Sequence, residues 1–252
     1  MARLESLARR LRWVGGDQVP ERREIQRLAT RDRDPFYAVA ARYLPSDPAA
    51  TVVDVGAGHG GFVRALNLVH RYPRCYMLDG SAASVARLKE LGGEALQYMA
   101  PDPLPFLDAS VDFVHCSHLV EHLSPDDVHA LLREWDRVLR PGGVLVISAP
   151  LLWALFYGDL THVRPYEPEV FLKYLGGSAG ARSREVVSAA YEVLETTYRY
   201  ETRPVLQGIR ATHAWLDWPV LVLAKVCWAL GLRRLERSGF TLVLRKGGGR
   251  KP

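Results

Sequence analysis

Two carboxylates and a cluster of glycines give the strongest chemical signal in this 252-residue chain. The glycines lie in the segment Gly56-Ala57-Gly58-His59-Gly60-Gly61, and Asp54 lies two residues before the first of them. Glycines at such a corner let the backbone turn tightly and let a ligand approach where a side chain would block it. An acid at position 54 disfavours a pyrophosphate near the N-terminus of the following helix, but it suits a ligand that carries an amine.

The second carboxylate, Asp79, directly follows the run Cys75-Tyr76-Met77-Leu78. At the end of a strand it can accept hydrogen bonds from both hydroxyls of a ribose, or it can cap the helix that follows. The glycine cluster also satisfies the pattern G-x-G-x-x-G with Asp79 at about the right distance, so a nicotinamide dinucleotide is an alternative ligand. The negative charge of Asp54 argues against that alternative.

A third group of reactive side chains is His118, Glu121 and His122, whose spacing matches the H-x-x-E-H motif of certain zinc proteases. Protease chemistry would need a long helix that carries the motif and a further ligand downstream. Here the motif follows a predicted strand and stops at Leu123-Ser124-Pro125. We therefore predict no metal site and keep these residues as candidates for acid–base chemistry.

Alternating strand and helix patterns must position these side chains. Apolar or alternating runs predict strands at 51–55, 74–79, 95–99, 111–116, 143–148, 191–200 and 239–245. Helical patterns separate most of these runs, as is typical of an α/β fold with a doubly wound sheet. In such sheets ligands bind beyond the carboxyl ends of the strands, where the acids and histidines above are expected to lie.

Three segments resemble the class I S-adenosylmethionine-dependent methyltransferase family. Residues 52–60 resemble its first motif, residues 104–123 its fourth-strand region, and residues 137–143 its turn into the fifth strand. The resemblance implies a Rossmann-like, seven-stranded, mostly parallel sheet whose last strand runs antiparallel between the fifth and sixth. It also implies S-adenosylmethionine as the cofactor, a ligand that has an amine and a ribose but no phosphate.

The resemblance also implies a set of cofactor-binding residues. These are Asp54, Gly56, Ala57, Gly58, Phe62, Asp79, Gly80, Ala100, Pro101, Asp102, Cys116 and Ser117. The family usually places an acid after the third strand to contact the adenine, but this chain has Ala100 there. Either Asp102 reaches the adenine, or backbone groups of Ala100 and Pro101 serve alone.

The expected reaction is methyl transfer to a small molecule, with a sugar, a polyketide-like compound or a lipid-linked compound as the acceptor. An oxygen acceptor would need a general base, for which the candidates are His122, His162 and His118 in that order, with Glu121 and Tyr166 nearby. His162, Arg164 and Tyr166 crowd one segment, where Arg164 could hold an anionic group of the acceptor. A related quinone-pathway methyltransferase family has two acids and a histidine in this region that bind a divalent ion, but in this chain His118 replaces the first acid. The alternatives are an NAD(P)-dependent oxidoreductase and a non-catalytic module for cofactor binding or assembly.

The sequence divides into five parts. We expect N-terminal helices or a lid at 1–49, the cofactor-binding core at 50–204, a hydrophobic helical insertion at 205–238, the last core strand at 239–246 and a disordered tail at 247–252. Within the insertion, 220–230 is almost wholly apolar, and a helix starting at Asp217-Trp218-Pro219 would extend about 18 Å, too short to span a bilayer. Packing against its own domain is favoured over contact with a second subunit or with lipid.

Composition bounds the partners and the compartment. The net charge is +5 with 48% hydrophobic residues, and the charge is dispersed, so no nucleic-acid partner is predicted. The three cysteines have no metal spacing and no even pairing, and no secretory signal or spanning segment is evident, so the expected location is cytoplasmic. A basic amphipathic pattern at 2–14 leaves a peripheral membrane contact open, and a homodimer remains an alternative.

Overall fold

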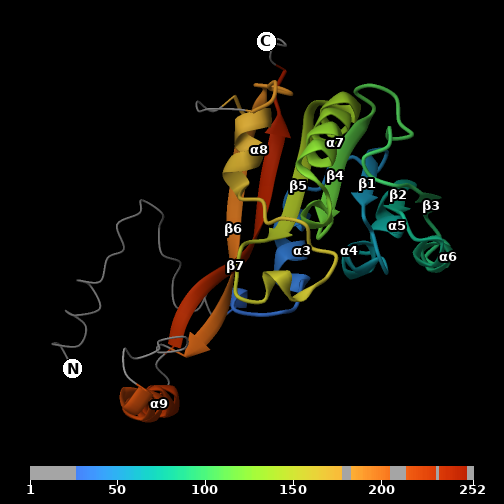
Figure 1. Cartoon of the computed structure of the whole chain (residues 1–252). Helices are drawn as coiled ribbons and strands as arrows, with labels where there is room; N and C mark the ends of the chain where they lie inside the picture. The colour runs from blue at the N-terminus through green and yellow to red at the C-terminus, as the bar shows by residue number, and fades with distance from the viewer. Residues whose placement is uncertain (1–26, 178–182, 205–213, 231–232, 249–252) are drawn as a thin grey trace, which may run out of the picture.

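The protein is described by a computed structural model that covers residues 27–177, 183–204, 214–230 and 233–248. Its centre is a seven-stranded sheet in the order β3-β2-β1-β4-β5-β7-β6 (Figure 1). The strands are β1 (Thr51–Val55), β2 (Arg74–Asp79), β3 (Glu94–Gln97), β4 (Val111–Ser117), β5 (Leu139–Pro150), β6 (Tyr191–Pro204) and β7 (Arg233–Lys246). Strands β1 to β5 pair in parallel, whereas β7 is antiparallel to both β5 and β6. The predicted doubly wound, mostly parallel sheet is confirmed.

Helices cover both faces of this sheet and bury a separate apolar core on each. One core lies under α7 (Pro125–Val138) and α8 (Pro168–Leu175). The other lies under α3 (Asp34–Ala41), α4 (Gly61–Ala65), α5 (Leu68–Arg71) and α6 (Ala82–Lys89). Strand β1 contributes side chains to both cores, because Val53 and Val55 belong to the first core and Val52 belongs to the second. Every residue of β1 is buried, so the strand holds the glycine turn that follows it in a fixed position at the edge of the sheet.

The last two strands are longer than the sequence predicted. Strand β7 begins at Arg233 rather than at 239, and β6 continues to Pro204, so the insertion is shorter than predicted. The two strands keep pairing out to Pro204↔Arg233, beyond the edge of the other five strands. Aromatic and β-branched residues such as Tyr200 and Thr202 favour this extended ribbon. Elsewhere the helix expected after the glycine turn is broken at Asn67, a left-handed residue with φ 52°, into α4 and α5.

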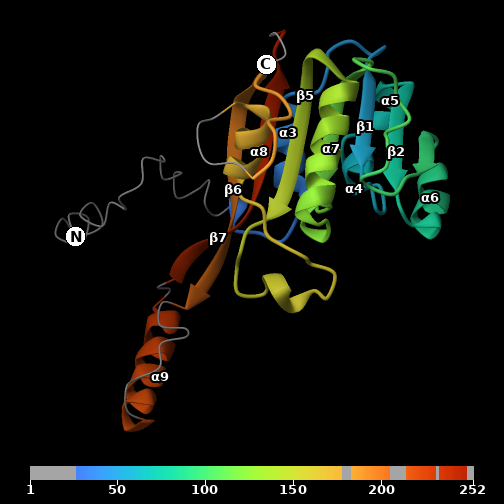
Figure 2. The same cartoon turned by 45° about the horizontal axis from the view of Figure 1, so that its top comes forward.

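The apolar insertion forms α9 (Ala214–Ala229), with Pro219 inside the helix and not at its start. Both views place α9 beyond the far end of the β6–β7 ribbon, away from the rest of the sheet (Figure 2). Trp218 is 73% exposed and Leu230 is 72% exposed. These exposed side chains do not favour packing against its own domain, the favoured prediction, and which surface covers the helix stays a prediction. No helix in the part of the chain that the structure describes is long and apolar enough to cross a membrane.

The N-terminal predictions are only partly covered. The basic amphipathic pattern at 2–14 lies outside the described residues, as do the other residues of 1–49 that precede residue 27. Helix α3 begins at Asp34 with Pro35 in its first turn, a position that suits proline. Two short 3-10 turns, η1 (Val120–His122) and η2 (Phe156–Gly158), follow β4 and β5 at their carboxyl ends.

Candidate active site

The glycine turn after β1 packs closely against β2, but the space around Gly58 is open. Gly56 and Gly58 have φ of +74° and +57°, a conformation that favours glycine. The backbone N–H groups of Gly56 and Ala57 both donate to the carbonyl of Leu78, at 2.8 and 2.9 Å, which holds the turn against β2. A Cβ on Gly58 would meet no atom within 4 Å. This open, glycine-lined cradle fits the cofactor that the sequence implies.

Asp79 lies at the carboxyl end of β2 and faces the same turn. Its Oδ2 accepts a hydrogen bond from Gly58 N at 2.8 Å, and its Oδ1 accepts one from Ser81 N at 2.9 Å. The helix cap weighed from the sequence is made by Ser81 instead, whose side chain accepts a hydrogen bond from Ser84 N at 3.3 Å at the start of α6. Each carboxylate oxygen of Asp79 has a second lone pair, so this side chain keeps the capacity to accept from a ribose hydroxyl. The ribose contact stays a prediction. The next residue, Gly80, lies beside the Met99 side chain.

Asp54 has a partner that the sequence reasoning missed. Its Oδ1 accepts a hydrogen bond from Nδ1 of His115 at 2.7 Å, and both side chains are buried. The two residues are register neighbours on β1 and β4. The Asp54 carboxylate therefore already has a buried hydrogen-bond partner within the sheet, which weakens the argument that it guards the turn as a free side chain. A contact with the cofactor's amine stays a prediction.

Two other predicted cofactor residues belong to the core. The Phe62 ring is buried and stacks on His115 with 3.7 Å between ring centroids. Its burial favours a core role for Phe62, and the contact with the cofactor stays a prediction. Cys116 is fully buried, and burial raises the pKa of its thiol well above the usual value, so only its backbone can serve a ligand. After β3, the turn at 99–102 is closed by Asp102 N, which donates to the Met99 carbonyl at 2.8 Å. Which group there meets the adenine stays a prediction, with Ala100, Pro101 and Asp102 as candidates.

A small cavity, called here the Arg199 pocket, lies at the carboxyl ends of β4 and β5. It is lined by Ser117 and His118 after β4, Ser148 of β5, Arg199 of β6, Phe240 and Thr241 of β7, and Arg33, Phe36 and Tyr37 at the start of α3. The α3 side chains close it on the side of the glycine turn, since a Cβ on Gly61 would lie 3.0 Å from the Tyr37 hydroxyl. The pocket is thus adjacent to the cradle of the cofactor.

Arg199 is a half-buried cation without a carboxylate. Its guanidinium lies over the Phe36 ring, 5.7 Å from the centroid, and its Nη1 lies 3.5 Å from Nε2 of His118. Within the described residues no acid comes within ion-pair distance of it. Burial, and then the like charge of Arg33, lower the pKa of Arg199. No local pattern in β6 marked this residue in the sequence, because its neighbours in the pocket come from distant parts of the chain.

His118 connects the pocket to Glu121. The residue has φ +57°, which is uncommon for any residue but glycine, and its N–H donates to Ser148 O at 2.9 Å. Its Nδ1 donates to Oε1 of Glu121 at 3.0 Å, which leaves the Nε2 lone pair turned toward Arg199. Burial lowers the pKa of His118, so the neutral ring is favoured.

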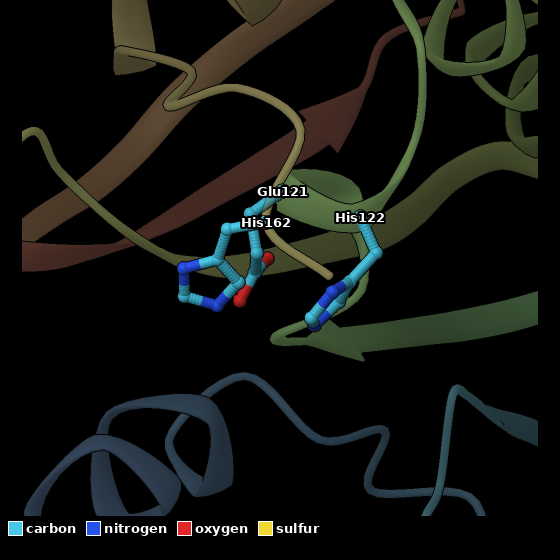
Figure 3. A group of neighbouring side chains, drawn as sticks. All are labelled: Glu121, His122 and His162. Carbon is cyan, nitrogen blue, oxygen red and sulfur yellow. The ribbon is translucent and has the colours of Figure 1, made fainter. Parts of the chain in front are cut away.

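His122 and His162 lie together beside Glu121, as the sequence could not show. Their ring centroids are 5.0 Å apart, and the carboxylate of Glu121 lies next to both rings (Figure 3). Glu121 and His122 come from η1, whereas His162 comes from the loop between η2 and α8. The two histidines ranked first as bases are thus part of one cluster with Glu121, next to the Arg199 pocket.

The rest of the segment 159–166 shapes this loop. Asp159 accepts hydrogen bonds from both N and Oγ1 of Thr161, which lower the pKa of its carboxyl and fold the turn that presents His162. Tyr166 is buried, and its hydroxyl donates to the Leu123 carbonyl at 3.0 Å. Its burial and this bond favour a packing role for Tyr166, and the catalytic role stays a prediction. Arg164 is exposed and lies over the Tyr166 ring, so the cations that line the pocket are Arg199 and Arg33 and not Arg164.

Comparison with known proteins points to the family that the sequence resembles. A family model described as "Methyltransferase domain" matches residues 53–147, which run from β1 to β5. Trans-aconitate 2-methyltransferase of Deinococcus radiodurans is 34% identical over 109 residues, which are 42% of this chain and 40% of that protein. A Mycobacterium tuberculosis protein named as a probable S-adenosylmethionine-dependent methyltransferase is 33% identical over 129 residues, 51% of this chain and 46% of that protein. The chain thus spans less than half the length of these curated relatives.

The fold has close counterparts among solved structures. A SAM-dependent methyltransferase from Archaeoglobus fulgidus superposes with a TM-score of 0.57 at 20% sequence identity, over 85% of this chain and 95% of that one. At such low identity the likeness speaks for the fold alone. It extends well beyond residues 53–147, to most of the described chain.

Proposed function

Because this chain belongs to the class I S-adenosylmethionine-dependent methyltransferase family, we propose that it methylates an oxygen atom of a small molecule that carries an anionic group. S-adenosylmethionine is its cofactor and supplies a methyl group that the positive charge of the sulfonium already activates. The acceptor class and the methylated atom are the proposed parts.

The observation that carries the proposal is Arg199, which has no carboxylate at ion-pair distance among the described residues, in a pocket next to the cofactor cradle. The charges of Glu121 and Glu201 favour its charged form only from beyond that distance. A buried cation is costly unless an anion or hydrogen bonds compensate it. Here an aromatic ring and a neutral imidazole are its neighbours, and Arg33 adds a second positive charge at the rim. A carboxylate or phosphate of the acceptor would supply the missing partner, for which the fork of an arginine is well suited.

The chain's own residues would then divide the work. The turn at Gly56 and Gly58, with Asp79, would hold the cofactor, and the backbone of Ser117 would line the path to the acceptor. A leaving group that is already activated asks the protein mainly to align the acceptor and to exclude water, which the closing ring of Tyr37 supports. His118 is the best-placed base, because its Nε2 lone pair faces the pocket while Glu121 orients the ring.

One relative supports an anionic acceptor, since its name specifies trans-aconitate, a carboxylate. A lipid-linked acceptor is the second candidate, and the exposed apolar residues of α9 favour it because they could rest in a lipid interface. These same residues also support pairing with a second copy. Neither the dinucleotide oxidoreductase nor the non-catalytic module has an observation in its favour beyond those weighed from the sequence.

The test is a substrate survey with the purified protein. Calorimetry should first show tight binding of S-adenosylhomocysteine and none of NAD(P). Formation of S-adenosylhomocysteine from S-adenosylmethionine is then measured with hydroxylated carboxylates and phosphorylated compounds, each paired with its amide or dephosphorylated analogue. We expect turnover with anionic members and loss of that turnover in Arg199→Met. Equal turnover of charged and uncharged analogues would contradict the anionic acceptor, and transfer to nitrogen or carbon would contradict O-methylation.

A further inference from the structure

We infer that Glu121, His122 and His162 form a binding site for a divalent first-row transition-metal ion. One ligand atom from each residue lies within 4.8 Å of the other two (Figure 3). The sequence alone predicted no metal here, because the motif His118-x-x-Glu121-His122 has no third ligand nearby in the chain. The fold supplies that third ligand as His162, and His118 is not a member of the set.

Hydrogen bonds fix the tautomers of both histidines. Nδ1 of His122 contacts the Thr161 carbonyl at 3.1 Å, and Nδ1 of His162 contacts the Phe156 carbonyl at 2.6 Å. A carbonyl oxygen only accepts, so Nδ1 must carry the proton in each ring. The lone pair therefore resides on Nε2, the atom that remains for a metal ion. Such a donation to a carbonyl is the usual way in which proteins orient a metal-binding histidine.

Glu121 is the independent observation that points to a ligand. Its side chain is fully buried, and only Oε1 has a hydrogen-bond partner, the Nδ1–H of His118. Oε2 is buried with no partner among the described residues. A buried carboxylate oxygen without a partner costs free energy, and native proteins satisfy nearly all such groups. A cation between Oε2 and the two imidazoles would satisfy it.

The backbone holds the three residues in place. The carbonyl of Glu121 accepts hydrogen bonds from the N–H groups of Val163 and Arg164, at 2.8 and 3.3 Å. The loop that carries His162 is thus tied to the turn that carries the other two residues. Ligand atoms that share one such ion lie roughly 3–4 Å apart. Because the three ligand atoms already lie within 4.8 Å of one another, the side chains would need to move only slightly to bind the ion.

The donor set selects the class of ion. Two imidazole nitrogens and one carboxylate suit Zn²⁺, Co²⁺, Mn²⁺ or Fe²⁺, whereas Mg²⁺ and Ca²⁺ prefer oxygen ligands throughout. Three protein ligands also leave at least one coordination position open, as in catalytic zinc sites.

The consequence for the acceptor rests on the proposed function. An acceptor oxygen in the open position would lose its proton more readily, because a bound cation stabilises the anion. His122 and His162 would then act as ligands and not as bases, which leaves His118 as the base candidate at the pocket.

Metal binding is tested directly and without turnover. Tag-free protein is stripped with a chelator and titrated with Co²⁺, whose visible absorption reports nitrogen coordination, and with Zn²⁺ in a calorimeter. We expect one ion per chain and weaker binding of Mg²⁺. His122→Ala and His162→Ala should each lower the affinity at least about tenfold, since each removes one ligand. His70→Ala, on the exposed helix α5, is the matched control and should change nothing.

Glu121→Gln keeps the shape of the side chain and should also lose the ion, but its burial makes folding uncertain, so the two histidine variants decide. No spectral change with Co²⁺, or binding that persists unchanged in both histidine variants, would overturn the inference. Titrations with S-adenosylhomocysteine separate the two proposals. A chain that binds this compound but no ion refutes only the metal site, and a chain that binds the ion but not this compound refutes only the proposed function.

Discussion

Replacing Arg199 by methionine should stabilise the protein while removing its affinity for anions. The side chain is half-buried next to His118 and Phe36, with no acid at ion-pair distance among the described residues. Burial lowers the pKa of Arg199, which means that its charged form is less favourable there than in water. Methionine is similarly long and unbranched, so it can fill much of the same space without the charge.

The expected gain follows from two opposing terms. Losing the contact with the Phe36 ring costs about 0.5–1 kcal/mol. Removing a partly desolvated and unpaired charge gains about 1–3 kcal/mol. The net rise in the free energy of unfolding is thus about 1 kcal/mol, or roughly 2–4 °C in melting temperature for a chain of this size.

Thermal and urea unfolding measure the stability, and phosphate against chloride at equal ionic strength measures the anion effect. Wild-type protein should melt higher in phosphate than in chloride, because an anion that binds only the folded state stabilises it. Arg199→Met should melt at the same temperature in both salts. Arg199→Lys keeps the charge and should show no gain in stability. If Arg199→Met instead unfolds more easily by 1 kcal/mol or more, the guanidinium is compensated in a way that our reasoning missed.

Three further outcomes are expected. Asp79→Asn loses one charged acceptor, so affinity for S-adenosylhomocysteine in calorimetry should fall by about 1.5–3 kcal/mol, roughly 10- to 150-fold; unchanged affinity would exclude the ribose contact. Gly56→Ala should lower the free energy of unfolding in urea by about 1–2 kcal/mol, because φ is +74° and the new Cβ would lie 3.2 Å from a leucine side chain. Gly142→Ala is the control and should cost less, because φ is +81° there but the space is open. Hydrogen bonds from Arg137 lower the pKa of Glu134, so their contribution is present above the ordinary glutamate pKa and lost as pH falls through the lowered value. Glu134→Gln should therefore cost about 1–2 kcal/mol at neutral pH and progressively less below about pH 4, and a cost independent of pH would refute the assignment.

Local features of the sequence predicted the fold well. The glycine turn and Asp79 at the end of β2 are each encoded within a few residues, and each appears where expected. The ends of strands were less predictable, because β6 and β7 extend each other through pairing that no local pattern contains.

The site was predicted only where it is local. The bond between Asp54 and His115 depends on the register of β1 against β4. Likewise the meeting of Glu121 with His162 depends on where two loops end at the same sheet edge. Phe62 and Tyr166 have residue types that suit either a site or a core, and the sequence does not show that both rings are buried. Composition could not reveal Arg199, since nothing in β6 shows that its neighbours lack an acid.

The position of β7 between β5 and β6 affects how the protein is made. Arg199 and Thr241 lie on strands that leave the ribosome late, and β5 has an unpaired edge until β7 arrives. The cradle at Gly56 and Asp79 is built wholly from earlier residues. A growing chain could therefore hold the methyl donor before it has any place for the acceptor, and the exposed edge of β5 is where an unfinished chain would be most open to aggregation.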